Sequence, residues 1–291
     1  SVAKMLKVPS LIIGMTIVAM GTSLPETSVS IAASMNNQNT LAVSNVVGSN
    51  IFNLMVVLGI CAVISKLQVS RDVLKRDYPF SVLCAILLLV CGCIGMELGR
   101  IDGIVFLVIF VGFIVVLIKS AMDARKRGEI SEKEREMNEE MSEMKEQPVW
   151  KSIIYIVGGA IAIKYGGDWV VDSASTIATS FGISATLVGL TICSVGTSLP
   201  ELVTSIVAAR KNELDMAVGN VVGSNVFNIL MVLGVAATIS PITFLMENVI
   251  DIIVLLVFSL ITWVFCLLPS LYVRQLTADE RFPDTICGKA V

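Results

Sequence analysis

Apolar residues dominate the chain in runs long enough to cross a bilayer, and polar residues gather between those runs. A transmembrane helix needs about 20 predominantly apolar residues. Runs of this kind predict eight spans, at residues 9–33, 41–64, 78–96, 101–119, 152–172, 184–209, 214–239 and 247–268. The pattern therefore predicts an all-α polytopic membrane protein with about eight transmembrane helices in this chain.

The polar segments divide the chain into two membrane halves. Residues 120–151 form the longest polar stretch, with a basic cluster followed by an acid-rich run, and are expected to be a charged linker. This linker separates an N-terminal half, 1–119, from a C-terminal half, 152–268. Residues 269–291 are expected to be a polar tail.

Composition agrees with a membrane protein, since the chain is 55% apolar and only 15% charged, against about 25% charged residues in soluble proteins. Histidine is absent, which excludes imidazole metal ligation and imidazole acid–base chemistry. The seven cysteines form no Cys-x-x-Cys pair, so a zinc site or a disulfide framework has no support. We expect no enzymatic activity, no cofactor and no nucleic-acid partner.

The distribution of Lys and Arg predicts the orientation of the chain. If residues 120–151 are cytoplasmic, the loops alternate so that 19 of the 21 Lys and Arg residues lie on the cytoplasmic side. Such a bias is typical of cytoplasmic loops. The sequence therefore predicts a cytoplasmic linker, cytoplasmic chain ends and insertion in the cell membrane.

Two blocks of sequence occur twice, with an offset of 175 residues. The hexapeptide GTSLPE occupies residues 21–26 and 196–201, and NVVGSN occupies 45–50 and 220–225. Between residues 14–59 and 189–234, 26 of 46 aligned positions are identical. The chain therefore contains an internal repeat, with a first copy at 9–64 and a second at 184–239.

The two copies are predicted to have opposite orientations. Five spans separate equivalent elements, and an odd number of crossings reverses the direction of the chain. The repeats are therefore inverted and related by an axis in the membrane plane.

The first block places an acid and a proline in the middle of a span. A carboxylate at that depth is costly and marks a functional site by default. Pro25 and Pro200 each remove an intrahelical hydrogen bond, and the carbonyls near Ala19 and Ser194 are expected to be freed as oxygen ligands. Thr22, Ser23 and Glu26 are spaced to share one helix face, and the second copy repeats the arrangement with Thr197, Ser198 and Glu201.

The second block adds hydroxyl and amide oxygens. Ser49 and Asn53 are four residues apart, as are Ser224 and Asn228, so each pair lies on one helix face. Small residues at 44 and 48, and at 219 and 223, let helices approach closely. One such crossing in each half would gather four helices at the centre of the bilayer.

The assembled groups are all oxygen ligands, which suit hard cations such as Ca²⁺ and Na⁺. Two glutamates carry a charge of −2, which neutralises one Ca²⁺ or two Na⁺ but not both loads together. Mutually exclusive occupancy of one site is the physical basis of ion exchange.

At these motifs the chain resembles the sodium/calcium exchanger family, of the prokaryotic type without a large regulatory domain. The resemblance implies ten helices in two inverted halves, with Ca²⁺ and Na⁺ bound between the repeats. The implied ligands are Thr22, Ser23, Glu26, Ser49 and Asn53, with Thr197, Ser198, Glu201, Ser224 and Asn228, and the backbone carbonyls of Ala19 and Ser194. Compared with that pattern, the chain is expected to lack a first and a last helix. Some relatives carry Asp where this chain has Asn228, which leaves K⁺ dependence or H⁺ coupling open.

Other functions are compatible with parts of this pattern. The same two glutamates could carry protons in a H⁺/Ca²⁺ exchanger, although the hydroxyl groups favour sodium. A cation channel needs a continuous polar lining, whereas the polar residues here cluster at mid-span. A non-transporting fragment is the third alternative, because of the absent end helices. The oligomeric state is open.

Overall fold

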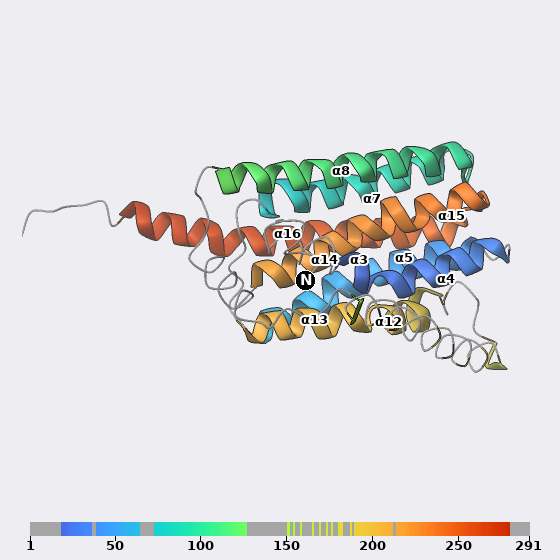
Figure 1. Ribbon diagram of the computed structural model, residues 1–291, viewed down its shortest axis with the longest axis horizontal. Helices are drawn as coiled ribbons and strands as arrows, with labels where there is room; N and C mark the ends of the chain where they lie inside the picture. Colours follow the sequence, from blue (N-terminus) through green and yellow to red (C-terminus); the bar gives the residue numbers. More distant parts are fainter. Residues whose placement is uncertain are drawn as a thin grey trace, which may run out of the picture.

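The computed structural model describes residues 19–36, 39–64, 73–126, 189–211 and 214–279, with isolated positions between 150 and 187. Its helices run roughly along the long axis of the molecule (Figure 1). The helices, π-helical turns (η) and strands are, in chain order, α3 (Ala19–Thr22), α4 (Leu24–Met35), α5 (Asn39–Phe52), η2 (Asn53–Val57), α6 (Leu58–Ile64), η3 (Val73–Asp77), α7 (Tyr78–Cys93), β1 (Glu97–Leu98), α8 (Arg100–Lys126), η4 (Gly189–Cys193), α12 (Ser194–Thr197), α13 (Leu199–Arg210), α14 (Leu214–Phe227), η5 (Asn228–Val232), α15 (Leu233–Ile239), β2 (Ile242–Thr243) and α16 (Met246–Asp279).

Among the described residues, five helical segments are long and apolar enough to cross a membrane, and a bent pair makes a sixth. The segments are Asn39–Ile64, Val73–Cys93, Arg100–Ser120, Met216–Ile239 and Met246–Leu267, with Leu190–Thr197 plus Leu199–Arg210 as the bent pair. These six agree with six of the expected spans. The span expected at 152–172 lies outside the described residues, and the one expected at 9–33 is described only from Ala19.

Several boundaries differ from expectation. Helix α8 runs on to Lys126, into the expected linker, and α16 runs on to Asp279, past the expected start of the polar tail at 269. The helix expected at 78–96 begins one π-turn earlier, at Val73, and ends at Cys93. The remainder of the linker, from 127, and the end of the tail, from 280, lie outside the described residues.

The internal repeat is visible in the helix boundaries. The bounds of α3, α4, α5, η2 and α6, shifted by 175, are those of α12, α13, α14, η5 and α15. Figure 1 shows that the two copies run in opposite directions, since α3 and α4 proceed toward one end of the molecule and α12 and α13 toward the other. The described fold is therefore all-α with two inverted repeats.

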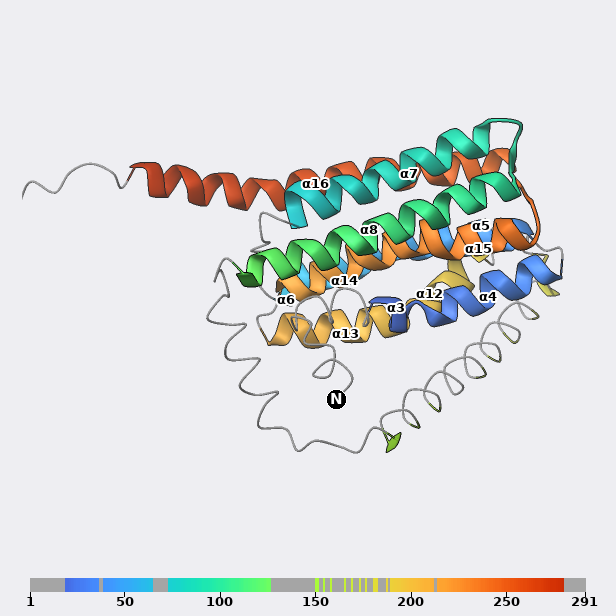
Figure 2. The same cartoon turned by 45° about the horizontal axis from the view of Figure 1, so that its top comes forward.

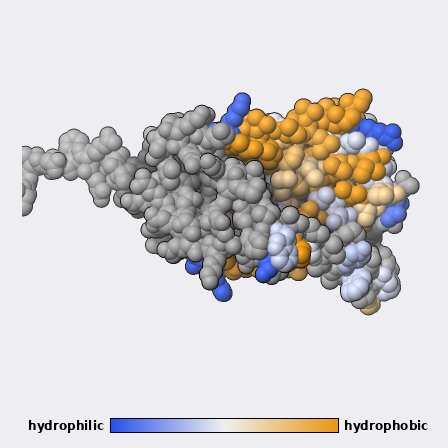
Figure 3. Space-filling view, in the orientation of Figure 1, coloured by the Kyte–Doolittle hydropathy of each residue, from blue (hydrophilic) through white to orange (hydrophobic). Residues whose placement is uncertain are grey.

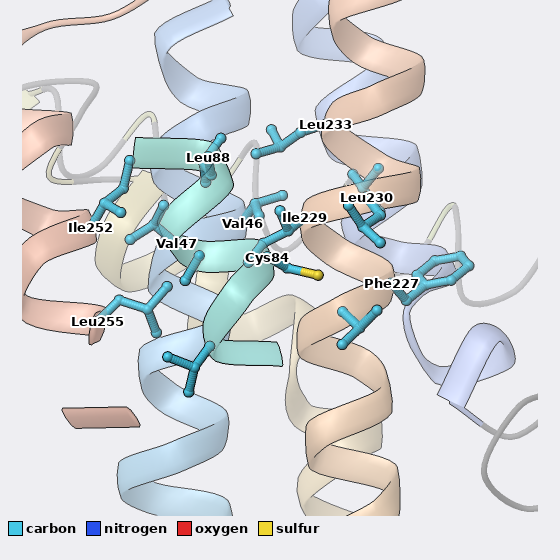
Figure 4. Close-up of a cluster of buried hydrophobic side chains, with 14 of the residues drawn as sticks. Val46, Val47, Cys84, Leu88, Phe227, Ile229, Leu230, Leu233, Ile252 and Leu255 are labelled. Atoms are coloured by element: carbon cyan, nitrogen blue, oxygen red, sulfur yellow. The ribbon is translucent and has the colours of Figure 1, made fainter. Parts of the chain in front are cut away.

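The bundle places the second blocks of both repeats at its centre. Helices α5, α14 and α15 lie between the outer helices α7 and α16 on one side and α4 and α13 on the other (Figure 2). A large cluster of buried aliphatic residues joins α5, α7, η5, α15 and α16, and Figure 4 shows part of it, including Val46, Leu88, Ile229 and Leu255. Packing against this apolar cluster fixes the positions of the central helices.

A pair of short strands links the two halves at one end of the molecule. Strand β1 pairs antiparallel with β2, with Glu97 opposite Thr243 and Leu98 opposite Ile242. The turn between α7 and α8 is thereby joined to the turn between α15 and α16. The surface over α8 is hydrophobic and ends in hydrophilic residues (Figure 3), as expected of a helix that faces lipid.

Candidate functional site

Each repeat contains a helix that breaks at the serine of the first block. In the second copy, α12 ends at Thr197 and α13 begins at Leu199, with a bend of 50° between the two helical segments. In the first copy the break is at Ser23, and in both copies the proline is at the start of the second helix. Because proline has no N–H and its ring clashes with the preceding turn, it favours a break at this position.

The expectation that these prolines free the carbonyls of Ala19 and Ser194 is wrong. Each carbonyl accepts a backbone N–H, from Ser23 at 3.1 Å in the first copy and from Ser198 at 3.1 Å in the second. The missing donor of a proline lies four residues after its partner, so the carbonyls that lose a bond are those of Gly21 and Gly196.

The two acids of the repeat lie in one cluster between the halves. Glu26 and Glu201 are both fully buried. Ser23 Oγ donates to Glu201 Oε1 at 2.9 Å, and Ser198 Oγ donates to Glu26 Oε1 at 3.0 Å. Each serine therefore bonds the acid of the opposite repeat, which holds the two broken helices together.

The second oxygen of each acid has no hydrogen-bond partner. Glu26 Oε2 and Glu201 Oε2 are buried and unpaired. Within the described part of the chain, no Lys or Arg forms an ion pair with either acid. An ionised carboxylate deprived of water is costly unless it is paired with a cation or bonded to donors. The two orphaned oxygens are therefore the strongest structural sign of a cation site.

Amide oxygens at equivalent positions of the two repeats show the same lack of partners. Asn53 Oδ1 and Asn228 Oδ1 are buried and unpaired. Helix α4, which carries Glu26, packs against η5, which begins at Asn228, and α13 packs in the same way against η2. Each orphaned amide oxygen thus lies on an element that packs against the helix of an acid.

The amides begin π-helical turns, which the sequence analysis did not predict. The N–H of Leu58 donates to the carbonyl of Asn53, and that of Leu233 to the carbonyl of Asn228, both across five residues. Single π-turns inside α-helices occur frequently at functional sites. Here one starts at the same asparagine in each repeat.

A second pair of asparagines, absent from the expected site, bonds across the two repeats. Asn50 Nδ2 donates to the carbonyl of Asn225 at 3.2 Å, and Asn225 Nδ2 donates to the carbonyl of Asn50 at 3.4 Å. Their side-chain oxygens accept bonds from Asn228 Nδ2 at 3.1 Å and Asn53 Nδ2 at 3.2 Å, respectively. Their presence in both copies of NVVGSN was the available signal.

A further asparagine in each repeat ties the two blocks together. Asn45 Nδ2 donates to Ser30 Oγ at 3.4 Å, and Asn220 Nδ2 donates to Ser205 Oγ at 3.1 Å. The first bond joins α5 to α4, which carries Glu26, and the second joins α14 to α13, which carries Glu201. These polar contacts hold α4 against α5 and α13 against α14.

The hydroxyls of the site are arranged differently in the two halves. Ser49 Oγ lies 3.3 Å from Thr197 Oγ1 and donates to the carbonyl of Ser194 at 3.4 Å. Its counterpart Ser224 is buried with no partner for Oγ, and Thr22 is only partly buried, donating to the carbonyl of Ala19 at 3.2 Å. Helix α14 packs against α3 as α5 packs against α12, but the hydrogen bonds of Ser49 to α12 have no counterpart at Ser224.

The expected close approach of helices is confirmed at Gly48. A Cβ added there would overlap the carbonyl of Leu190 and Oγ of Ser194. Only glycine lets α5 come this near to the broken helix of the second repeat, as the spacing of small residues predicts. The sequence thus supplies both the polar groups and the space for them.

The fold and this buried oxygen cluster define a polytopic membrane protein with inverted repeats and a polar site between them. Residues 1–119 and 151–282 match the family described as sodium/calcium exchanger protein. The chain belongs to the sodium/calcium exchanger family, and it is an integral membrane antiporter rather than an enzyme. The family assignment made from the motifs is confirmed.

Individual relatives support this assignment. The chain is 38% identical over 263 residues to the inner membrane protein YrbG of Escherichia coli, covering 88% of this chain and 79% of that one. It is 31% identical to the sodium/calcium exchanger MaX1 of Methanosarcina acetivorans, covering 84% and 77%. A solved structure of the sodium-calcium exchanger NCX_Mj, soaked with Na⁺ and Sr²⁺, matches with a TM-score of 0.67 and 31% identity, covering 91% and 82%.

Proposed function

We propose that the chain exchanges Na⁺ for Ca²⁺ by alternating access, with the buried oxygen cluster as a common site for both ions. The observation that carries the proposal is the pair of buried acids, each with one oxygen that has no partner. Their combined charge of −2 balances one Ca²⁺ or two Na⁺. Since both loads together would leave the buried site positively charged, one ion displaces the other.

The proposed ligands are the acids Glu26 and Glu201, the amide oxygens of Asn53 and Asn228, and nearby hydroxyls. Ca²⁺ takes 6–8 oxygen ligands, mixing carboxylates, amides and carbonyls. The hydroxyls of Ser23, Thr22 and Ser49, with those of Ser198, Thr197 and Ser224, complete the set. The carbonyls of Ala19 and Ser194 belong to it as well, because an oxygen that accepts one backbone N–H has a second lone pair. All but Thr22 are buried.

The orientation belongs to the same proposal. With the linker 120–151 and the chain ends on the cytoplasmic side of the cell membrane, the export of Ca²⁺ would be driven by Na⁺ entry. The family relationship supports a cation/Ca²⁺ exchanger, and the hydroxyl groups around the acids favour Na⁺ as the coupling ion.

The test is uptake of ⁴⁵Ca²⁺ into vesicles that contain the purified chain. An outward Na⁺ gradient should drive uptake, and Glu26→Gln or Glu201→Gln should reduce it to the level of empty vesicles, because the remaining single charge cannot neutralise Ca²⁺. Glu97→Gln, at an exposed acid in β1, serves as the control and should leave uptake intact.

A proton-coupled exchanger is the second candidate, because a buried carboxylate with a free oxygen can also carry a proton. The same vesicles decide between the two with separate Na⁺ and pH gradients, each with and without K⁺. Uptake that follows the pH gradient and ignores the Na⁺ gradient would reject sodium coupling.

A further inference from the structure

We propose that Asn50 and Asn225 are positioning residues that turn the side-chain oxygens of Asn228 and Asn53 toward the transported ion. The inference rests on the proposed function, since it assigns the cluster as the ion site. It concerns four buried amides, two in each repeat, which bond to one another across the interface between the repeats.

The orientation of the first two amides follows from the backbone. A carbonyl only accepts hydrogen bonds, whereas a side-chain amide has an NH₂ end that donates and an oxygen that accepts. Because Asn50 faces the carbonyl of Asn225, it must present its NH₂ group there. Asn225 is fixed in the same way by the carbonyl of Asn50.

The orientation of the other two amides follows from the first. With its NH₂ group used, Asn50 presents Oδ1 to Asn228, which must answer with its own NH₂ group at 3.1 Å. Asn225 does the same to Asn53 at 3.2 Å. Two backbone carbonyls thus determine the direction of all four amides.

The consequence is that Asn53 and Asn228 each turn an oxygen away from the quartet. These two oxygens are among the buried atoms that lack partners, and they lie on the π-turns that pack against the helices of the acids. If either amide were reversed, its NH₂ group would face the cation and its oxygen would face another oxygen. The quartet therefore excludes the orientation that repels a cation.

The first experiment measures equilibrium binding of ⁴⁵Ca²⁺ to the purified full chain in detergent. Asn50→Ala removes the acceptor that holds Asn228 and should weaken binding by about 10- to 100-fold, as is typical when a partner that orients a metal ligand is lost. Asn248→Ala is the control. Asn248 lies at the start of α16, is equally buried and donates a hydrogen bond to Ser44 of α5. This change should leave the Kd unchanged.

A double-mutant comparison separates positioning from a general loss of structure. If Asn50 acts through Asn228, adding Asn50→Ala to Asn228→Ala should weaken binding no further. Asn53 is oriented by Asn225 and not by Asn50. Adding Asn50→Ala to Asn53→Ala should therefore weaken Ca²⁺ binding further, by the same factor as Asn50→Ala alone. Equal, additive losses in both combinations would overturn the inference.

A third experiment covers the case in which Asn50→Ala does not fold. In Asn50→Asp, a protonated side chain can donate to the carbonyl of Asn225 and accept from Asn228, whereas an ionised one only accepts. The ratio of the Kd of Asn50→Asp to the Kd of the unmodified chain should therefore decrease as the pH falls. A ratio that is constant with pH, or an unchanged Kd in Asn50→Ala, would contradict the proposal.

These outcomes are distinct from a failure of the proposed function. If the unmodified chain binds Ca²⁺ but shows no Na⁺-driven flux, only the exchange mechanism is rejected. If the chain exchanges ions and the Asn50 variants bind as well as the unmodified chain, only the positioning role is rejected. A chain that binds no Ca²⁺ would overturn both.

Discussion

At the scale of single residues, the site is defined by what its buried polar atoms lack. Glu26 and Glu201 each receive one serine hydroxyl, and each keeps an oxygen with no partner. The penalty for burying two such acids is several kcal/mol each before compensation. In the proposed function, a bound cation would offset that penalty.

The crossed hydroxyl bonds predict equal effects in the two halves. Ser23→Ala and Ser198→Ala each remove a hydrogen bond to a charged group, worth about 1.5–3 kcal/mol. We expect the Ca²⁺ concentration for half-maximal exchange to rise by at least about tenfold in either variant, measured as initial ⁴⁵Ca²⁺ uptake at fixed Na⁺ gradient.

Ser34→Ala is the matched control for this prediction. Ser34 is as fully buried as Ser23 and lies on α4, the helix that follows Ser23, but its hydroxyl has no hydrogen-bond partner. Its removal should leave the uptake curve unchanged. Equal behaviour of the Ser23 and Ser34 variants would show that the bond to Glu201 does not matter for transport.

Much of this chemistry is predictable from the repeated blocks. The duplicated acids, serines and asparagines point to one buried oxygen cluster, and the structure brings them together. What the sequence could not show is that each serine bonds the acid of the opposite repeat, or that Asn50 and Asn225 join the cluster. Those contacts depend on how two helices distant in sequence cross, which residue spacing within one helix does not encode.

At the scale of elements, the spans are predictable and their local distortions are not. Hydrophobic length identifies the membrane helices, because hydrocarbon thickness sets it. The π-turns at Asn53 and Asn228 have no such signature, because one wider turn leaves the hydrophobic length of the span almost unchanged. The carbonyls that lose a bond at the prolines lie two residues later than expected, because the missing N–H of Pro25 or Pro200 would have bonded the carbonyl four residues earlier, at Gly21 or Gly196.

Close packing of α8 on α15 predicts a glycine requirement in α8. A Cβ at Gly103 would lie 2.7 Å from the carbonyl of Gly234 and 2.8 Å from Oγ1 of Thr238. Gly103→Ala should therefore destabilise the protein by about 1–3 kcal/mol, as overpacking does. Thermal unfolding in detergent, followed by tryptophan fluorescence or size exclusion, measures the effect as a lowered Tm.

The same helix supplies the control. Gly112 is exposed, and a Cβ added there meets nothing within 4 Å. Gly112→Ala should keep or slightly raise the Tm, because alanine favours the helix by about 1 kcal/mol over glycine. If both alanine variants unfold at the same temperature, close packing of α8 on α15 does not limit the stability of the protein.

At the scale of the whole molecule, the inverted repeat explains how one site can face two compartments. The two copies have matching boundaries and opposite directions, so each conformation of one half has a counterpart in the other. Ser49 bonds to Thr197 and to the carbonyl of Ser194, whereas the hydroxyl of its counterpart Ser224 has no partner. Two halves with the same sequence pattern in different arrangements are what alternating access requires.

The proposed orientation places the turn between α7 and α8 on the outer face and the linker on the cytoplasmic face. Glu97, in the exposed part of that turn, is separated by α8 from the linker, and α8 is one span. A cysteine at Glu97 and one at Ser131 should therefore lie on opposite sides of the membrane. The charge bias of the loops predicts which side each occupies.

Labelling of intact cells with a membrane-impermeant maleimide tests this orientation. In a background with Cys93→Ser and Cys287→Ser, we expect Glu97→Cys to react without permeabilisation, because its side chain is exposed beyond the end of a span. Ser131→Cys should react only after permeabilisation, and the background protein should not react at all. The reverse pattern would show that the chain has the opposite orientation in the membrane, with the linker outside the cell. Labelling of both cysteines from outside would contradict the odd number of spans between them, on which the inversion of the repeats also depends.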